Sequence, residues 1–164
     1  MLRPIHPPEA TPARKVKGYK MPETRDNLVS WEFVSERMFQ SRHYWISTVF
    51  PGQRPHVVPV WGIWFENRLY FEGSLQTAWG KNILKNPQIA VHLPSAEQVV
   101  TIEGSAHILQ DDELNEDEWN LLDGTFQKKY QVDKGSPYIY VEPKRVLAWN
   151  GEDLTTMTRW VFKP

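Results

Sequence analysis

The sequence predicts a mainly β fold, a small antiparallel β-barrel with helices packed outside it. Residues 99–109 alternate apolar and polar side chains, as a half-buried antiparallel strand does. Residues 43–50 lead into Pro51-Gly52, a pair suited to the centre of a type II turn, and then into a second apolar run. Helical periodicity occurs in short stretches before and between such strands. At 164 residues the chain fits one domain whose core needs neither disulfide nor metal.

The first 25 residues differ in composition from the rest of the chain. They hold five of the 13 prolines and six basic residues against two acidic ones, which is poor material for a core. We therefore expect an extended N-terminal arm over residues 1–25 and the barrel domain over residues 26–164, with a disordered leader as the alternative for the arm. The arm's basic cluster has one aromatic neighbour, Tyr19, so we do not expect nucleic-acid binding.

A helix and a hairpin should follow the arm. Asp26 or Asn27 can cap a helix that presents apolar residues at helical spacing and ends near Ser41. The strand over residues 43–50 should then return, through the turn, as a strand over residues 56–65. Pro59 and Gly62 interrupt this second strand, so it should be bulged or lie partly at a sheet edge.

The remaining elements alternate strands with two helices. A third strand is expected over residues 69–72, then a short helix between Ser74 and Asn86 with Thr77 as its cap. Gly104 should mark a bulge in the alternating strand. An acidic run over residues 111–118 begins a helix with a buried aromatic stripe. Further strands are expected over residues 88–93, 99–109, 138–141, 146–150 and 157–162.

Several classes of chemistry are absent from the sequence. There is no cysteine, no histidine pair has zinc-motif spacing, and neither a serine elbow nor a nucleotide-binding glycine motif occurs. We therefore expect no metal and assign no catalytic residue. The net charge of −1 provides no global field for nucleic acid or an anionic membrane. The longest apolar run is too short to span a bilayer, and no secretory leader is evident, so a cytoplasmic location is expected.

One segment stands out as an anion site. Residues 73–82 pass from a strand through small polar residues into a helix whose first turn has unpaired N–H groups. Lys81 lies four residues after the cap Thr77, on the same helical face. An ordinary capped helix with a solvated lysine is the alternative. Similarly, the aromatic residues of the second and third strands either wall a flat ligand or simply fill the core: Trp61, Trp64, Tyr70 and Phe71.

These segments, in their order and spacing, resemble a known family. YWISTVFPGQRPHVVPVWGIWFENRLYFEGS, KNILKNPQIAVHL, VVTIEGSAHIL and TRWVF are similar to the pyridoxamine 5'-phosphate oxidase-like family of flavin-binding split β-barrels, from about Trp31 to Phe162. The resemblance implies a six-stranded antiparallel Greek-key split barrel of the FMN-binding type. It also implies a homodimer with cofactor sites at the interface, which binds FMN or, in some branches, the deazaflavin F420.

The resemblance also implies which residues contact the cofactor. The second strand and the end of the third strand would contact the cofactor, the second strand at the flavin ring. The start of the following helix would hold the phosphate, and a terminal Arg-Trp pair would approach the flavin. In this chain those positions are His56, Val57, Val58, Pro59, Val60, Trp61, Glu72, Gly73, Ser74, Thr77, Trp79, Lys81, Asn82, Arg159 and Trp160.

The chain also departs from the family pattern. Where the oxidase has serine, arginine and lysine for the phosphate, this chain has Thr77, Ala78 and Trp79, so two cations are missing. His56 replaces an arginine, and vitamin B6 oxidation is therefore not expected. We expect an FMN-dependent oxidoreductase that transfers hydride or electrons to a small molecule. The alternatives are an F420-dependent reductase, or a flavin- or haem-binding dimer without turnover in which Trp79 fills the phosphate region.

Overall fold

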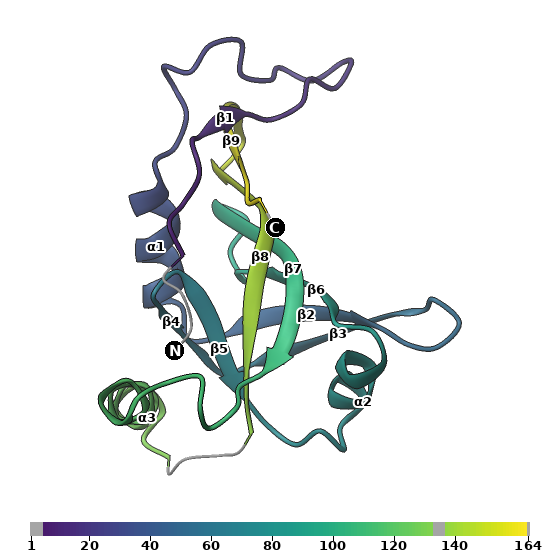
Figure 1. Cartoon of the computed structure of the whole chain (residues 1–164). Helices are drawn as coiled ribbons and strands as arrows, with labels where there is room; N and C mark the ends of the chain where they lie inside the picture. The colour runs from purple at the N-terminus through teal and green to yellow at the C-terminus, as the bar shows by residue number, and fades with distance from the viewer. Residues whose placement is uncertain (1–4, 133–136, 164) are drawn as a thin grey trace.

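The computed structural model describes residues 5–132 and 137–163 (Figure 1). In these ranges one antiparallel sheet follows the order β1-β9-β8-β7-β6-β2-β3, and β8 also pairs with β5, which pairs with β4. The sheet curls into a barrel that does not close. Its strands are β1 (Thr11–Pro12), β2 (Tyr44–Val49), β3 (Pro55–Val60), β4 (Gly62–Phe65), β5 (Arg68–Glu72), β6 (Gln88–His92), β7 (Gln98–Ile108), β8 (Tyr138–Asn150) and β9 (Asp153–Val161).

The helices of the described ranges pack outside the sheet, as predicted. They are α1 (Trp31–Gln40), α2 (Ala78–Lys85) and α3 (Glu116–Tyr130). Helix α1 begins at its cap Ser30, whose side chain accepts the Phe33 N–H, and not at Asp26 or Asn27. The Thr158 hydroxyl of β9 accepts the N–H of Val29 at 2.8 Å, which holds the residue before the cap against β9. Helix α3 starts with a capping box between Asn115 and Glu118.

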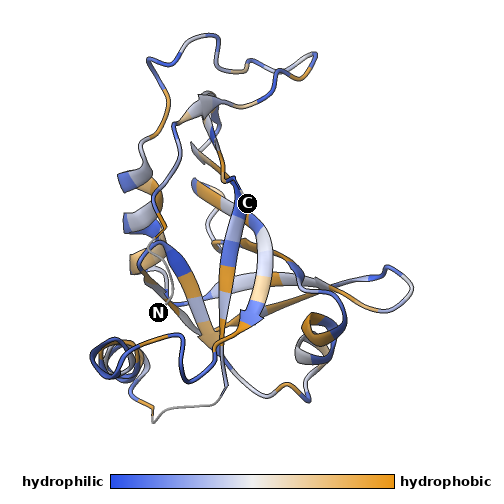
Figure 2. Cartoon of the chain, in the orientation of Figure 1, coloured by the Kyte–Doolittle hydropathy of each residue, from blue (hydrophilic) through white to orange (hydrophobic). Residues whose placement is uncertain are grey.

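The core divides into two clusters. The larger one fills the barrel between the strands, α1 and α2, and the smaller one lies under α3, where Leu122 and Phe126 are buried. Hydrophobic residues concentrate on the strands in Figure 2, whereas α3 is mostly hydrophilic on its outside. The alternation predicted for β7 is confirmed, because Val100, Ile102 and Ala106 are all buried.

Local turn and bulge predictions are confirmed. The N–H of Gln53 donates to the Phe50 carbonyl at 3.0 Å and Gly52 has φ +83°, which is the type II turn around Pro51-Gly52. The register of β7 against β8 shifts between Glu103 and Gly104, where the bulge was expected. The predicted second strand is split at Trp61 into β3 and β4, and β3 lies at a sheet edge in the described strand order.

The prediction of two strands on either side of Glu142-Pro143 is wrong, because β8 runs through both residues. Pro143 faces the β7 bulge at Gly104. On its other side β5 pairs with β8 only up to Val141, and β9 pairs with it only from Arg145. Pro143 therefore sits where the strand needs no N–H donor, and the proline is tolerated.

The N-terminal arm lies against the barrel from its described beginning. Thr11 and Pro12 pair with β9 opposite Arg159 and Thr158, and the Ala13 N–H donates to the Met157 carbonyl at 3.0 Å. Ile5 and Met21 are buried. Residues 11–13 of the arm are thus held by β9, whereas residues 14–20 are exposed. No helix in the described ranges is long and apolar enough to cross a membrane.

Candidate functional site

Strand β3 carries the first group of predicted site residues. It pairs only with β2 in the described sheet, and His56 lies opposite Thr48 in this register. His56, Val58 and Val60 share the barrel-facing side, while Val57 and Pro59 are exposed on the other side. The Phe50 ring contacts the His56 ring, with 4.9 Å between centroids. The strand therefore presents an apolar outer surface and places one imidazole beside the hairpin turn.

Trp61 forms the corner between β3 and β4. Its ring stacks on Tyr130 of α3 at 5.0 Å and is 45% exposed. The Tyr130 hydroxyl accepts the N–H of Gly62 at 2.9 Å and donates to the Gly62 carbonyl at 2.6 Å. A Cβ on Gly62 would lie 2.7 Å from the Tyr70 carbonyl oxygen, so only glycine fits this corner. Trp61 is thereby fixed toward α3.

Lys129 of α3 ties the same corner to β2. Its ammonium donates to the Gly62 carbonyl at 3.0 Å and to the Tyr44 hydroxyl at 3.1 Å. Burial and, to a smaller extent, the nearby Arg42 charge together lower the pKa of Lys129 to about 8. Burial also raises the pKa of Tyr70 to about 12.

Stability should therefore depend on pH in the alkaline range. The unfolded chain binds a proton at Lys129 up to its ordinary pKa of about 10.5, so the free energy of unfolding should rise between pH 8 and 10, by about 1 kcal/mol or more. Above pH 10 the tyrosines reverse the slope, because they ionise in the unfolded chain first. Urea denaturation at several pH values measures this profile. Lys129→Met should remove most of the increase in unfolding free energy between pH 8 and 10. An unchanged increase in this variant would mean that Lys129 does not cause it.

The segment between β5 and α2 bends tightly. Glu72 ends β5, Gly73 has φ +147°, and the Ser74 carbonyl accepts the Thr77 N–H at 3.1 Å and the Thr77 hydroxyl at 2.8 Å. The Thr77 side chain also caps α2 by accepting the Gly80 N–H at 3.1 Å. The predicted cap is confirmed, and its hydroxyl is fully used within the turn.

The start of α2 retains two unused donors. The N–H groups of Ala78 and Trp79 have no acceptor among the described residues, since the helix begins here and Thr77 serves Gly80. Ala78 and Lys81 are exposed next to them. Two first-turn N–H groups with one ammonium nearby form a donor set that suits an anionic group such as a phosphate.

Asn82 connects this helix to the hairpin. It is 2% exposed, and its side-chain amide donates to the Thr48 hydroxyl at 3.0 Å. Thr48 is itself 1% exposed and lies opposite His56. The structure thus brings the helix of the predicted phosphate segment against the hairpin of the predicted ring contacts. Sequence reasoning missed Thr48, although the inward positions of Tyr44 and Ile46 on the same strand could have indicated it.

Two predicted site tryptophans are buried in the core. Trp79 is 8% exposed, and its ring packs edge-on against the Phe71 ring with 5.6 Å between the centroids. The ring also lies so close to Gly73 that a Cβ at this position would be 2.8 Å from Trp79 Cζ2. Trp160 is 1% exposed and packs against Trp31 at 5.4 Å. Within one chain, Trp79 therefore neither presents its ring at the helix surface nor fills the place of a cation there.

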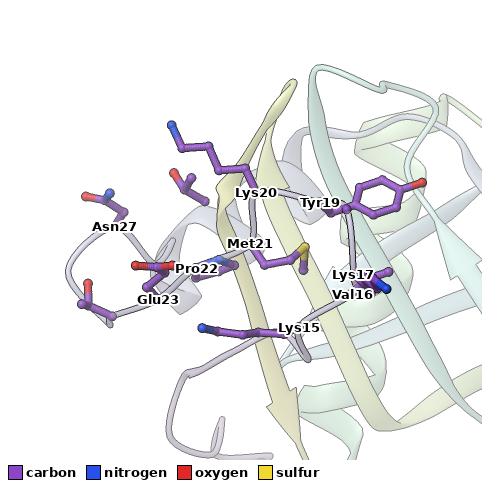
Figure 3. Close-up of a pocket in the computed structure, with 12 residues that line it drawn as sticks. Lys15, Val16, Lys17, Tyr19, Lys20, Met21, Pro22, Glu23 and Asn27 are labelled. Atoms are coloured by element: carbon purple, nitrogen blue, oxygen red, sulfur yellow. The ribbon is translucent and has the colours of Figure 1, made fainter.

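Strand β9 and the arm loop lie away from α2. In Figure 1, the labels of β1 and β9 and the arm loop are at the top of the view, and α2 is at the lower right. The arm loop lines a hollow of about 790 Å³, but Figure 3 shows Lys15 and Lys20 extending in separate directions. In a single chain neither Arg159 nor these lysines supply the cations missing from the helix start.

A sequence profile of the pyridoxamine 5'-phosphate oxidase family matches residues 32–150. The chain belongs to this family. A comparison with curated proteins found no match. Solved structures do match: an FMN-binding, pyridoxamine 5'-phosphate oxidase-related protein from Nostoc punctiforme has 16% identity and a TM-score of 0.54, covering 84% of this chain and 98% of its own.

Two further matches are known as binders of other cofactors. An FAD-binding protein from Mesorhizobium loti has 14% identity and a TM-score of 0.60, covering 82% of this chain and 96% of its own. A heme-binding protein from Mycobacterium smegmatis has 18% identity and a TM-score of 0.61, covering 82% and 60%. The family and its split-barrel fold are thus established, and its structural relatives include FMN- and FAD-binding proteins.

Proposed function

We propose that this member of the pyridoxamine 5'-phosphate oxidase family binds FMN and uses it as an oxidoreductase acting on a small molecule. The observation that carries the proposal is the pair of unused N–H groups at Ala78 and Trp79, on a helix joined to the His56 hairpin through Asn82 and Thr48. A phosphate fits this donor set, with Lys81 as its cation. Bound flavin would supply hydride and electron transfer, so no side-chain nucleophile is required.

A second copy of the chain is part of the proposal. Val57 and Trp61 are 48% and 45% exposed, and they lie on or beside β3, an edge strand of the described sheet. Such an apolar edge supports association with another subunit, which would cover the cofactor from its other side. Light scattering of the purified chain should give the mass of a dimer; a monomer at micromolar concentration would remove this part of the proposal.

Cofactor titration tests the function directly. The purified chain should show a flavin absorbance spectrum or bind added FMN with a dissociation constant in the low micromolar range. Titrations with F420 and with haemin, run in parallel, test the two other cofactor classes. If FMN fails to bind at millimolar concentration, or if F420 or haemin binds far more tightly, the FMN proposal is wrong.

Lys81→Ala should weaken FMN binding about tenfold, because one charge-assisted contact to the phosphate is lost. Lys85→Ala is the matched control, since Lys85 is exposed in the last turn of the same helix, away from the N-terminal donors. Isothermal titration with both variants gives the comparison. Equal affinities for the two variants would place the phosphate elsewhere.

A further inference from the structure

A cavity of about 560 Å³ lies between the C-terminal parts of α1 and α3, above β4. Its floor is Ile63 and Trp64, which are 1% and 8% exposed, and the exposed ring of Phe39 stands at its edge. In Figure 1 this region is on the left of the molecule, with α1 and α3, whereas α2 and the β2–β3 hairpin turn are on the right. The cavity therefore lies away from the proposed phosphate site at the start of α2, while Trp61, which is predicted to contact the flavin ring, stacks on Tyr130 beside it.

Three cations line this cavity: Arg42, Lys128 and Lys129. No carboxylate lines it, and none of the three forms an ion pair within the described residues. The Arg42 guanidinium lies 5.5 Å from the centroid of the Tyr130 ring, and Lys129 is held by Gly62 and Tyr44. Arg42 and Lys129 are thus held near one another by their contacts, whereas Lys128 is an exposed cation at the same cavity.

The electrostatics of this group indicate what the cavity would accept. The Arg42 charge, together with burial, lowers the pKa of Lys129, which means that the two cations repel each other at neutral pH. An anion between them would relieve this repulsion. A neighbouring hollow of about 390 Å³, which shares Phe39 and Trp64, carries Glu36 and Glu66 instead. A bound anionic group would therefore be directed toward the α3 side.

We propose that this cavity binds a small aromatic carboxylate, or another flat apolar molecule with one anionic group. The ring would lie over Trp64 beside Phe39, and the anionic group would meet Arg42 and Lys128, with the Lys129 charge behind them. This combination of an aromatic floor and three cations resembles the usual lining of small-molecule sites, where few polar groups orient a mostly apolar ligand. The proposal does not depend on flavin binding.

Fluorescence titration with 1-anilinonaphthalene-8-sulfonate tests the site, with benzoate as competitor. Arg42→Gln and Lys128→Gln should each weaken probe binding about fivefold to tenfold, and benzoate should displace the probe. Two controls should leave probe binding unchanged: Lys85→Gln, an exposed lysine on α2, and Ala78→Pro, at the proposed phosphate site. The uncharged N-phenyl-1-naphthylamine should bind more weakly and should not respond to either cation variant.

Four outcomes would overturn the proposal. If Lys85→Gln weakens probe binding as much as Lys128→Gln does, the binding is non-specific. If Ala78→Pro weakens probe binding about tenfold, the probe occupies the flavin site. If the uncharged probe binds equally well, or benzoate does not compete, the cations do not recognise an anion. Circular dichroism of each variant verifies that it is folded. If the Arg42 and Lys128 variants bind the probe as the parent chain does, the cavity proposal is wrong, and the FMN titrations still test the proposed function separately.

Discussion

Ala78→Pro should weaken FMN binding about tenfold while leaving the thermal stability unchanged. Ala78 is the first residue of α2, where proline suits the helix, and its N–H is one of the two unused donors. The preceding residue, Thr77, has φ −63° and ψ 163°, a conformation that a following proline favours. The substitution therefore removes one hydrogen-bond donor and little else.

The double variant Ala78→Pro/Lys81→Ala should lose about a hundredfold in affinity, because the N–H and the ammonium would both bind the phosphate. FMN fluorescence titration measures both affinities, and thermal unfolding verifies the fold. Riboflavin, which lacks the phosphate, should bind the parent chain and the double variant with the same affinity. A parallel loss for riboflavin would mean that the substitutions disturb the ring site and not a phosphate site.

Gly104→Ala should destabilise the chain by about 3 kcal/mol. A Cβ at Gly104 would lie 2.2 Å from the Glu142 carbonyl oxygen and 3.2 Å from the Pro143 Cα, and backbone atoms cannot rotate away as a side chain can. Urea denaturation measures the loss.

The matched control for Gly104→Ala is the same substitution at Gly124, in the middle of α3. Apart from its chain neighbours and the adjacent backbone of α3, no atom of the described residues would lie within 4 Å of a Cβ at Gly124. Gly124→Ala should therefore stabilise the chain by about 0.5 to 1 kcal/mol, because alanine is the better helix former. If both substitutions change stability in the same direction, the close approach at the bulge is not the cause.

Features set by neighbouring residues were predictable from the sequence. The Pro51-Gly52 turn, the Thr77 cap and the Gly104 bulge each follow from the conformational limits of one or two residues, and the structure contains all three. The order and spacing of the strand segments were also enough to predict membership of the family. The match to the family profile confirms this prediction.

Features that depend on distant partners were not predictable. The residue before the cap of α1, Val29, donates its N–H to Thr158, which lies far along the chain. Strand β8 continues through Pro143 because β5 and β9 leave a gap beside it. The link from Asn82 to Thr48 and the burial of Trp79 likewise follow only once the barrel is assembled. The contacts assigned by resemblance to His56 and its neighbours stay predictions.

The position of β8 in the sheet has a consequence for how the chain folds. This strand pairs with β5, β7 and β9, yet it begins only at Tyr138. During synthesis, β5 and β7 leave the ribosome with open edges and must wait for the last part of the chain. Such long-range pairing slows folding and exposes nascent strands to aggregation. We expect the cell's chaperones to meet this chain before β8 closes the two edges.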